Sequence, residues 1–171
     1  MKCKPVRTPE EISTLAQVAD EIWHEYWPSL IGDAQTDYMV EQFQSESALA
    51  HAINEDGYLY YLLFEGDRIV GYMGAQPQED EKRLFLSKLY VYEAERGNGY
   101  AAEALKLLEL ICKESWLKTI YLTVNKGNDL AIDVYKAKGF DIVDSVEKDI
   151  GDGFVMDDYI MEKKIALSCC L

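Results

Sequence analysis

Hydrophobic and polar positions divide the chain into a helical N-terminal part and a remainder rich in strands. Over residues 8–27, apolar residues recur every three or four positions, which is the spacing of one buried helix face. Thr8 and Glu11 flank a proline in the order of a capping box, so we expect the helix to begin there. The same spacing predicts a second helical region over residues 36–53, with a break near Ser45.

The rest of the chain alternates between runs of strand-forming residues and helical patterns. We expect a short strand at Cys3–Arg7 before the helices, and strands on both sides of a turn at Glu65–Arg68 after them. A strand over 83–92, a helix over 99–115 and a strand over 118–125 should follow. The chain should then form a helix over 128–139, closed by Gly139, and a hairpin with its turn at Gly151–Gly153. Hairpins at both ends of a single βαβ crossover predict an α+β fold with a mixed, mostly antiparallel sheet, and not a doubly wound fold.

Length and composition limit the class of protein. A chain of 171 residues that is 49% hydrophobic can form one domain with a substantial core. No apolar run approaches the ~20 residues that cross a bilayer, and the N-terminus lacks the apolar segment of a signal peptide. We therefore expect a cytoplasmic protein that has no membrane partner.

The net charge and the cysteines exclude further classes. A formal net charge of −14 argues against a nucleic-acid partner, because binding phosphates requires Lys and Arg. This charge suits a cationic partner or substrate, or it serves solubility alone. Cys3, Cys112, Cys169 and Cys170 have no metal-ligand spacing, so we expect reduced thiols and no metal site.

A glycine-rich turn, "RGNG" at residues 96–99, separates a predicted strand from a predicted helix. The first N–H groups of a helix are unpaired and the helix dipole is positive there, so this end attracts phosphate oxygens. Glycine has no Cβ to block their approach, and Arg96 adds a positive charge. The pattern therefore predicts a phosphate-binding turn, and a purely structural turn is the alternative. The P-loop string GxxxxGK[ST] does not occur in the chain.

Two sequence blocks resemble the GNAT superfamily of N-acyltransferases. The first, "RGNGYA" at residues 96–101, matches that superfamily's [RQ]xxGx[GA] signature, and the second, "NDLAIDVYKAKGF" at residues 128–140, matches its NxxAxxxYxxxGF pattern. The resemblance covers about residues 58–164 and implies a GNAT fold with splayed central parallel strands. It also implies direct transfer of an acetyl group from acetyl-CoA, as co-substrate, to a primary amine in a ternary complex.

The resemblance implies roles for individual residues. Tyr135 is the catalytic residue that it implies, with its hydroxyl giving a proton to the leaving thiolate. A backbone N–H near Tyr90 or Val91 would hold the developing oxyanion. The cofactor-binding residues that the resemblance implies are Leu89, Tyr90, Val91, Arg96, Gly97, Asn98, Gly99, Tyr100, Ala101 and Asn128.

In similar enzymes the first helices and the last hairpin build the acceptor side. We therefore expect one domain spanning residues 1–171, with a helical acceptor-side region at 1–55 and the sheet and acetyl-CoA-binding core at 56–165. The residues that we expect to bind the acceptor are Trp23, Tyr26, Trp27, Asp157 and Asp158. Aromatic rings and carboxylates suit an ammonium group, so a small polyamine-like amine is expected, and the alternative is that these aromatic residues form core. A protein or peptide amine as acceptor, a non-catalytic acyl-CoA-binding regulatory module and a homodimer are left open.

No side chain stands out as the general base that deprotonates the amine. Some GNAT branches use a glutamate about thirteen residues before the motif arginine, but Arg83 holds that position here. The other titratable candidates are Glu79, Asp80 and Glu81, expected in the turn before the strand, and His24 and His51, expected on helix surfaces. A water chain to a tyrosine or to a backbone carbonyl is the remaining route.

Overall fold

Seven strands and six α-helices make up the computed structural model, which describes residues 1–167. The strands are β1 (Lys2–Pro5), β2 (Leu59–Glu65), β3 (Arg68–Gln78), β4 (Arg83–Val91), β5 (Thr119–Asn125), β6 (Asp141–Gly151) and β7 (Phe154–Lys164). The helices are α1 (Pro9–Tyr26), α2 (Pro28–Ile31), α3 (Asp33–Phe43), α4 (Glu46–Asn54), α5 (Tyr100–Glu114) and α6 (Asp129–Ala137), with a 3-10 helix η1 at Glu93–Glu95. Cys169 and Cys170, whose thiols are predicted to be reduced, lie outside the described residues.

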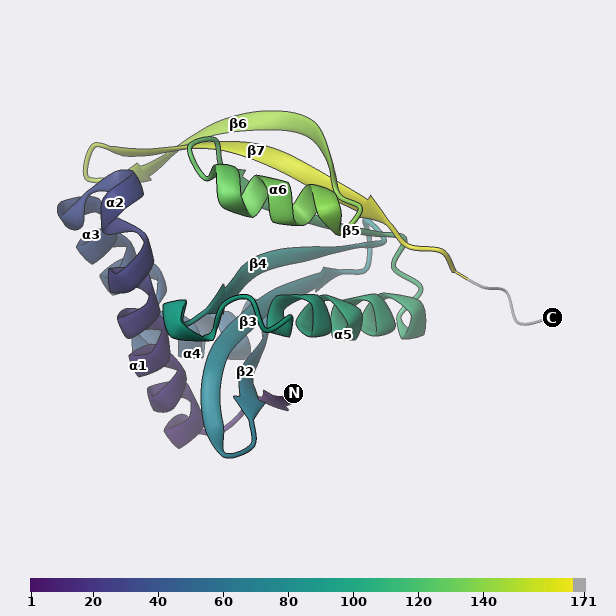
Figure 1. The fold of residues 1–171 in the computed structure, drawn as a ribbon, viewed down its shortest axis with the longest axis horizontal. Helices are drawn as coiled ribbons and strands as arrows, with labels where there is room; N and C mark the ends of the chain where they lie inside the picture. The colour runs from purple at the N-terminus through teal and green to yellow at the C-terminus, as the bar shows by residue number, and fades with distance from the viewer. Residues whose placement is uncertain (168–171) are drawn as a thin grey trace. The chain divides into compact units, whose positions relative to one another are not determined.

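The strands follow the order β1-β2-β3-β4-β5-β7-β6 in one mixed sheet (Figure 1). β4 and β5 pair in parallel, whereas β1–β2, β2–β3, β5–β7 and β6–β7 pair antiparallel. The parallel ladder runs only from Arg83 and Thr119 to Phe85 and Tyr121, although both strands continue beyond it. The mixed, mostly antiparallel α+β sheet with a splayed central parallel pair is therefore confirmed.

The chain forms two compact units, which are described in turn. The first comprises Met1–Gln76 and Lys88–Leu105, and the second comprises Pro77–Ser87 together with the chain from Lys106 onward. Among the described residues, neither unit has a helix that is long and apolar enough to cross a bilayer.

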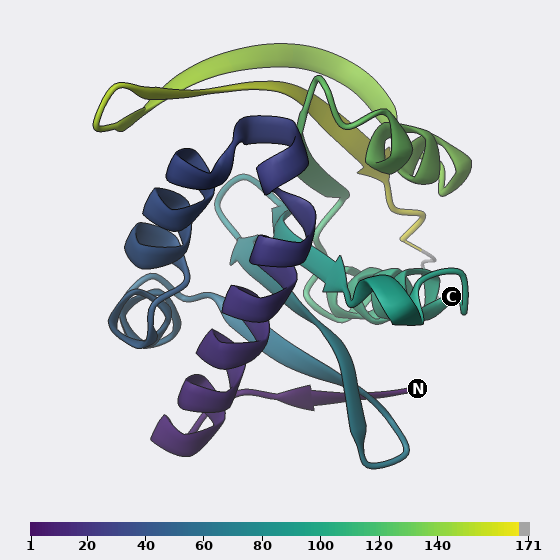
Figure 2. The ribbon, with the colours of Figure 1, turned by 60° about the vertical axis from the view of Figure 1, so that its left-hand side comes forward.

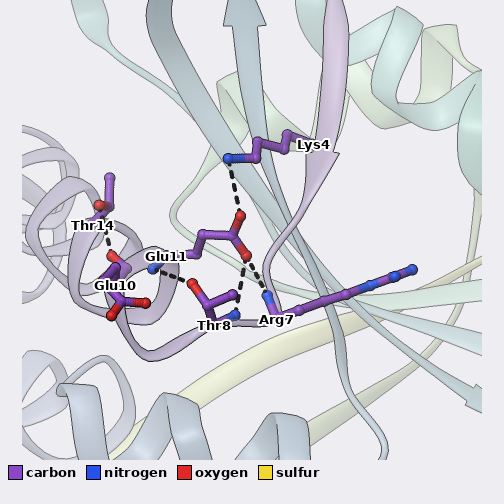
Figure 3. Close-up of polar contacts among 6 residues, drawn as sticks. All are labelled: Lys4, Arg7, Thr8, Glu10, Glu11 and Thr14. Atoms are coloured by element: carbon purple, nitrogen blue, oxygen red, sulfur yellow. Dashed lines mark hydrogen bonds and ion pairs between the residues drawn. The ribbon is translucent and has the colours of Figure 1, made fainter.

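Helix α1 of the first unit begins at the predicted capping box (Figure 3). The Thr8 hydroxyl accepts a hydrogen bond from the Glu11 N–H at 3.3 Å, and Glu11 accepts in return from the Thr8 N–H at 3.1 Å. The Glu11 carboxylate also pairs with Lys4 of β1 at 3.0 Å and accepts from the Arg7 N–H at 2.8 Å. The Lys4 ammonium and these N–H groups lower the pKa of Glu11 to about 2, so one side chain both caps α1 and ties it to β1.

Replacing Glu11 by glutamine is expected to lower the melting temperature by about 2 °C at pH 7, with progressively less effect toward pH 2. The folded pKa of about 2 lies below the ordinary value of 4.5, so the carboxylate stabilises the fold fully above pH 4.5 and loses this effect as the pH falls. Thermal unfolding followed by circular dichroism between pH 7 and pH 3 measures the difference. Glu10→Gln is the control, because the Glu10 carboxylate makes no hydrogen bond or ion pair within the described residues. A difference between Glu11→Gln and wild type that is the same at every pH would contradict this role.

A buried chain of hydrogen bonds crosses the core of the first unit. The Trp23 indole N–H of α1 donates to the Tyr72 hydroxyl of β3 at 2.7 Å, and this hydroxyl donates to the Gln44 side chain at 3.0 Å. Burial raises the pKa of Tyr72 well above its ordinary value, so the hydroxyl stays protonated and can donate. Gln44 ends α3 and Ser45 caps α4, so the helical region breaks where the sequence predicts. Figure 2 shows α3 and α4 beside α1.

Strands β5, β7 and β6 and helix α6 form most of the second unit (Figure 1). β6 and β7 are joined by a two-residue turn at Asp152 and Gly153, and both residues have positive φ, at +52° and +80°. This is the type I′ geometry that matches the twist of two antiparallel strands. Leu122 of β5, Met161 of β7 and the Phe140 ring are buried and contribute to the core of this unit.

Candidate active site

The glycine-rich turn lies in the first unit, between η1 and the first residue of α5. Gly97 and Gly99 have left-handed backbone angles, with φ at +81° and +83°, which L side chains rarely adopt. A Cβ at either position would have no described atom within 4 Å, so the backbone of the turn is accessible. The unpaired N–H groups at the start of α5 add the positive end of a helix dipole. The turn therefore has the geometry and the local charge for binding an anion.

Arg96 is held beside this turn by two contacts. Its Nε donates to the Val91 carbonyl oxygen at 3.4 Å, and its guanidinium lies over the Tyr26 ring, 5.0 Å from the ring centroid. The Asn98 side chain donates to the Glu95 carbonyl oxygen at 3.1 Å and so connects the turn to η1. These contacts position a permanent positive charge next to the glycines.

Strand β4 leads to the turn through Leu89, Tyr90 and Val91, which are half-buried. Gly71 of β3 allows a very close approach, because a Cβ there would lie 2.1 Å from the Tyr90 carbonyl oxygen. The Tyr90 ring stacks on the Tyr72 ring, with centroids 5.6 Å apart and planes at 28°. Both the backbone and the ring of Tyr90 are therefore fixed.

The three aromatic residues predicted to bind the acceptor lie at the end of α1 and differ in burial. Trp23 and Trp27 are 2% and 5% exposed, so both are core residues of the first unit. Tyr26 is half-buried and carries the Arg96 guanidinium over its ring. All three rings pack around Tyr90, at centroid distances of 5.6 Å for Trp23 and 6.4 Å for Tyr26 and Trp27. The two tryptophans are therefore core residues, which was the alternative to acceptor binding, whereas Tyr26 keeps accessible surface.

Tyr135 lies on α6 in the second unit, and residues of the second sequence block close both ends of this helix. Asn128 is buried and caps the start, where its side-chain oxygen accepts from the Ala131 N–H at 3.2 Å. At the other end, the Phe140 N–H donates to the Tyr135 carbonyl oxygen at 3.1 Å, and Gly139 adopts the left-handed conformation (φ +86°) of a Schellman motif. The Phe140 ring packs edge-on against the Tyr135 ring at 5.4 Å. Local contacts therefore fix both the backbone and the ring of Tyr135.

The two aspartates predicted at the acceptor side lie within β7, where successive side chains point to opposite faces of the sheet. Asp157 is exposed and its carboxylate pairs with Lys126 at 2.5 Å. Asp158 is 8% exposed and lies opposite Asn125 of β5. Among the residues that the structure describes, Asp158 is the only buried acidic residue.

The faces of β7 are identified by contacts to the helices of the second unit. Lys163 donates to Glu109 of α5 at 2.6 Å, and its ammonium lies over the Phe140 ring at 6.0 Å. Asp157 is six residues away from Lys163 within β7, and the pairing of β7 with β5 has no irregularity from Asp158 to Lys164, so Asp157 shares this face. Asp158 therefore points to the face opposite to the one that carries Glu109 and Phe140.

The remaining candidates for the general base, and Arg83 at the position of the family glutamate, lie in a turn, against a ring or on helix surfaces. The turn at residues 79–82 precedes β4 as predicted, and Arg83 lies over the Tyr121 ring at 4.2 Å. His24 and His51 are exposed helix residues, as predicted, and His24 is hydrogen-bonded to an aspartate of α3 at 2.9 Å. Within the described part of the chain, no group of three or more His, Cys, Asp or Glu side chains is arranged to hold a metal ion.

These elements define a mixed sheet in which an accessible glycine-rich turn lies between β4 and α5 and a doubly capped helix holds a tyrosine. A family model described as the acetyltransferase (GNAT) family matches residues 19–140. The chain therefore belongs to the GNAT acetyltransferase family, which confirms the resemblance of its two sequence blocks.

Several known proteins are similar to this chain. The uncharacterized N-acetyltransferase YycN of Bacillus subtilis is 30% identical over 91 residues, which cover 52% of this chain and 58% of that relative. The structure of the PaiA N-acetyltransferase from Thermoplasma acidophilum, solved in complex with coenzyme A, is similar to this chain with a TM-score of 0.77 and 20% sequence identity. The match covers 96% of this chain and 99% of that protein. The structure of the ribosomal-protein-S18-alanine N-acetyltransferase from Escherichia coli is similar with a TM-score of 0.71 and 16% sequence identity, and the match covers 98% of this chain and 95% of that protein. At these identities the two solved structures share the fold.

Proposed function

We propose that this protein is an N-acetyltransferase that moves an acetyl group from acetyl-CoA to a primary amine of a small, polyamine-like molecule. The accessible turn with left-handed Gly97 and Gly99 before α5 carries this proposal, because such a turn suits the pyrophosphate of acetyl-CoA. Family membership and the coenzyme A complex of the T. acidophilum relative support the same co-substrate. A thiol-release assay with acetyl-CoA and a panel of polyamines, amino acids, aminoglycosides and peptides tests it. Binding of CoA without thiol release for any amine would favour a non-catalytic acyl-CoA-binding module instead.

The residues of the first unit bind the co-substrate. Backbone N–H groups of residues 96–101 hold the pyrophosphate, and the Arg96 guanidinium offsets part of its charge. Backbone groups of Leu89 and Val91 pair with the amides of the pantetheine arm. The fixed position of Tyr90 supports this arrangement, because a rigid strand loses little conformational entropy when a ligand pairs with it.

Acyl transfer requires a neutral amine and a protonated leaving group. An ammonium with a pKa of ~10.4 is neutral in about one molecule in 2,500 at pH 7, so a proton must leave the amine before it attacks. The C–N bond forms and the C–S bond breaks, and the Tyr135 hydroxyl gives its proton to the departing thiolate. The proton that the nitrogen loses as it becomes an amide returns to the tyrosinate through water, so the protons balance. A backbone N–H at Tyr90 or Val91 donates to the carbonyl oxygen as negative charge develops on it.

The charges of the chain suit a cationic acceptor. The net charge of −14 attracts cations toward the protein. Asp157 is already paired with Lys126, whereas Asp158 is a buried carboxylate on the opposite face of β7. A charge-assisted hydrogen bond to an ammonium is strongest where water is excluded. We therefore assign the second ammonium of the acceptor to Asp158 and not to Asp157.

Replacing Asp158 by asparagine is expected to raise KM for spermidine about tenfold and to change KM for butylamine little, because only the polyamine has a second ammonium to lose its partner. Asp157→Asn is the matched control on the same strand and should leave KM for both amines unchanged, because Asp157 pairs with Lys126 on the other face. Steady-state kinetics with both amines at low and moderate salt measure the effect. An unchanged KM for spermidine in folded Asp158→Asn would contradict both the assignment of Asp158 and the proposal of a polyamine acceptor.

A further inference from the structure

We propose that helix α1 holds the cofactor turn in its binding geometry, with Glu21 and Glu25 as positioning residues for acetyl-CoA. Both carboxylates contact Tyr92–Arg96, the segment that joins β4 to the glycines. The inference rests on the proposed placement of the pyrophosphate at this turn. Neither glutamate lies in the two sequence blocks that identify the family, so nothing in those motifs predicts this role.

The first contact fixes the residue that follows β4. The Tyr92 hydroxyl donates to the Glu21 carboxylate at 2.5 Å, and the Gln17 side chain of α1 donates to the same carboxylate at 3.0 Å. The Tyr92 N–H donates to the Val70 carbonyl oxygen of β3 at 3.0 Å, so the backbone and the side chain of Tyr92 are both held. The Tyr92 hydroxyl and Gln17 lower the pKa of Glu21, and burial and Glu21 raise that of Tyr92. At neutral pH the pair is therefore a carboxylate and a protonated phenol.

The second contact lies one helical turn further along α1. The Glu25 carboxylate accepts from the Glu93 N–H at 3.2 Å, and this N–H opens η1, where no carbonyl of the 3-10 helix can accept it. Glu21 and Glu25 are four residues apart and so lie on the same helix face. The next residue, Tyr26, carries the Arg96 guanidinium, so α1 contacts both the start and the end of the segment.

The segment is also tied to β3, and the turn that follows it is held at its other end by α5. Arg68, the first residue of β3, pairs with Glu95 at 3.0 Å, and the Asn98 side chain bonds to the Glu95 carbonyl oxygen. A Cβ built on Gly97 or Gly99 has no described atom within 4 Å. The Gly99 carbonyl oxygen accepts from the Glu103 N–H of α5 at 3.1 Å. The turn is therefore held between the segment before it and the start of α5, and the Cβ side of both glycines stays open.

Positioning and electrostatic repulsion predict opposite effects on CoA binding. A glycine-rich turn loses much conformational entropy when it becomes ordered around a ligand, so a turn that is already held binds more tightly. Two carboxylates close to an anion site also repel the anion. Removing a carboxylate together with the hydrogen bond that it accepts therefore weakens CoA binding if positioning dominates and strengthens it if repulsion dominates.

Calorimetric titration of the full chain with CoA tests this proposal. Tyr92→Phe and Glu21→Leu are each expected to raise Kd about fivefold. The Kd of the double variant should be no higher than that of the weaker-binding single variant, because both substitutions remove the same contact. Glu25→Leu should raise Kd by a similar factor. Glu25→Gln keeps an oxygen that can accept from the Glu93 N–H and should bind like wild type. Glu10→Gln, which removes a charge from α1 without touching the segment, is the control and should also bind like wild type.

A second ligand separates positioning from a general loss of structure. Pantetheine lacks the pyrophosphate, so its Kd, measured by NMR titration, should be the same in wild type and in the Glu21 and Tyr92 variants. Equal weakening of CoA and pantetheine would make the contact purely structural, and tighter CoA binding in Glu21→Leu would mean that repulsion dominates. Either result overturns the proposal. If Gly99→Val binds CoA like wild type, the cofactor placement itself is wrong; if Gly99→Val loses CoA while the α1 variants keep it, only the positioning role fails.

Discussion

Replacing Tyr135 by phenylalanine is expected to lower kcat by about 10²-fold while the affinity for CoA stays unchanged. The variant loses only the hydroxyl that protonates the leaving thiolate in the proposed mechanism. The ring contact with Phe140 at 5.4 Å and the hydrogen bond to the Tyr135 carbonyl oxygen at 3.1 Å do not involve this hydroxyl, so α6 keeps its C-terminal end. Steady-state kinetics with acetyl-CoA and calorimetric titration with CoA measure the two quantities.

The control for this substitution is Tyr61→Phe, which removes a hydroxyl from a half-buried tyrosine of β2 outside both sequence blocks and should leave kcat unchanged. Equal kcat for Tyr135→Phe and wild type would assign Tyr135 to packing. An increased Kd for CoA with unchanged kcat would instead make the hydroxyl a cofactor contact.

Gly99→Val is expected to raise Kd for CoA by about 10²-fold or more in a protein that still folds. Valine is branched at Cβ and strained at the observed φ of +83°, so the turn must change its conformation. Its side chain would also fill the space beside the backbone that the pyrophosphate requires. Losing two charge-assisted hydrogen bonds, each at about 1.5–3 kcal/mol, corresponds to a change of this size. Calorimetric titration with CoA measures it.

Gly57→Val separates the effect on binding from the effect of backbone strain. Gly57 has a similar φ of +72°, has no described atom within 4 Å of a Cβ, and lies between α4 and β2. Both variants should lose a similar amount of thermal stability, and only Gly99→Val should lose CoA. Unchanged CoA affinity in folded Gly99→Val would place the co-substrate elsewhere.

Features that depend on neighbouring residues could be predicted from the sequence. The capping box at Thr8 and Glu11, the break at Ser45 and the left-handed Gly139 each follow from contacts within about five residues along the chain. The same holds for Tyr135, because the second block positions it through the ends of its own helix.

Features that depend on distant residues could not be predicted. The Glu21–Tyr92 contact joins residues 71 positions apart, and no sequence pattern relates them. Strand alternation shows that Asp157 and Asp158 face opposite ways, but the sequence does not show that Asp157 pairs with Lys126 or that Asp158 is the buried one. The sequence left two roles open for Trp23, core residue or acceptor contact, because an amphipathic pattern does not distinguish a core tryptophan from one that lines a site; the structure shows that Trp23 is buried.

The outer strand β6 bears on how the molecule avoids aggregation. Nine consecutive residues from Asp141 to Asp149 are exposed, and β6 is last in the strand order, so one edge has no neighbouring strand within the described chain. Such an edge is a template for pairing with the same strand of another molecule. Four carboxylates and a single ammonium lie along it, so two β6 edges that approached each other would bring like charges together. The charge pattern of β6 therefore protects this open edge against edge-to-edge aggregation.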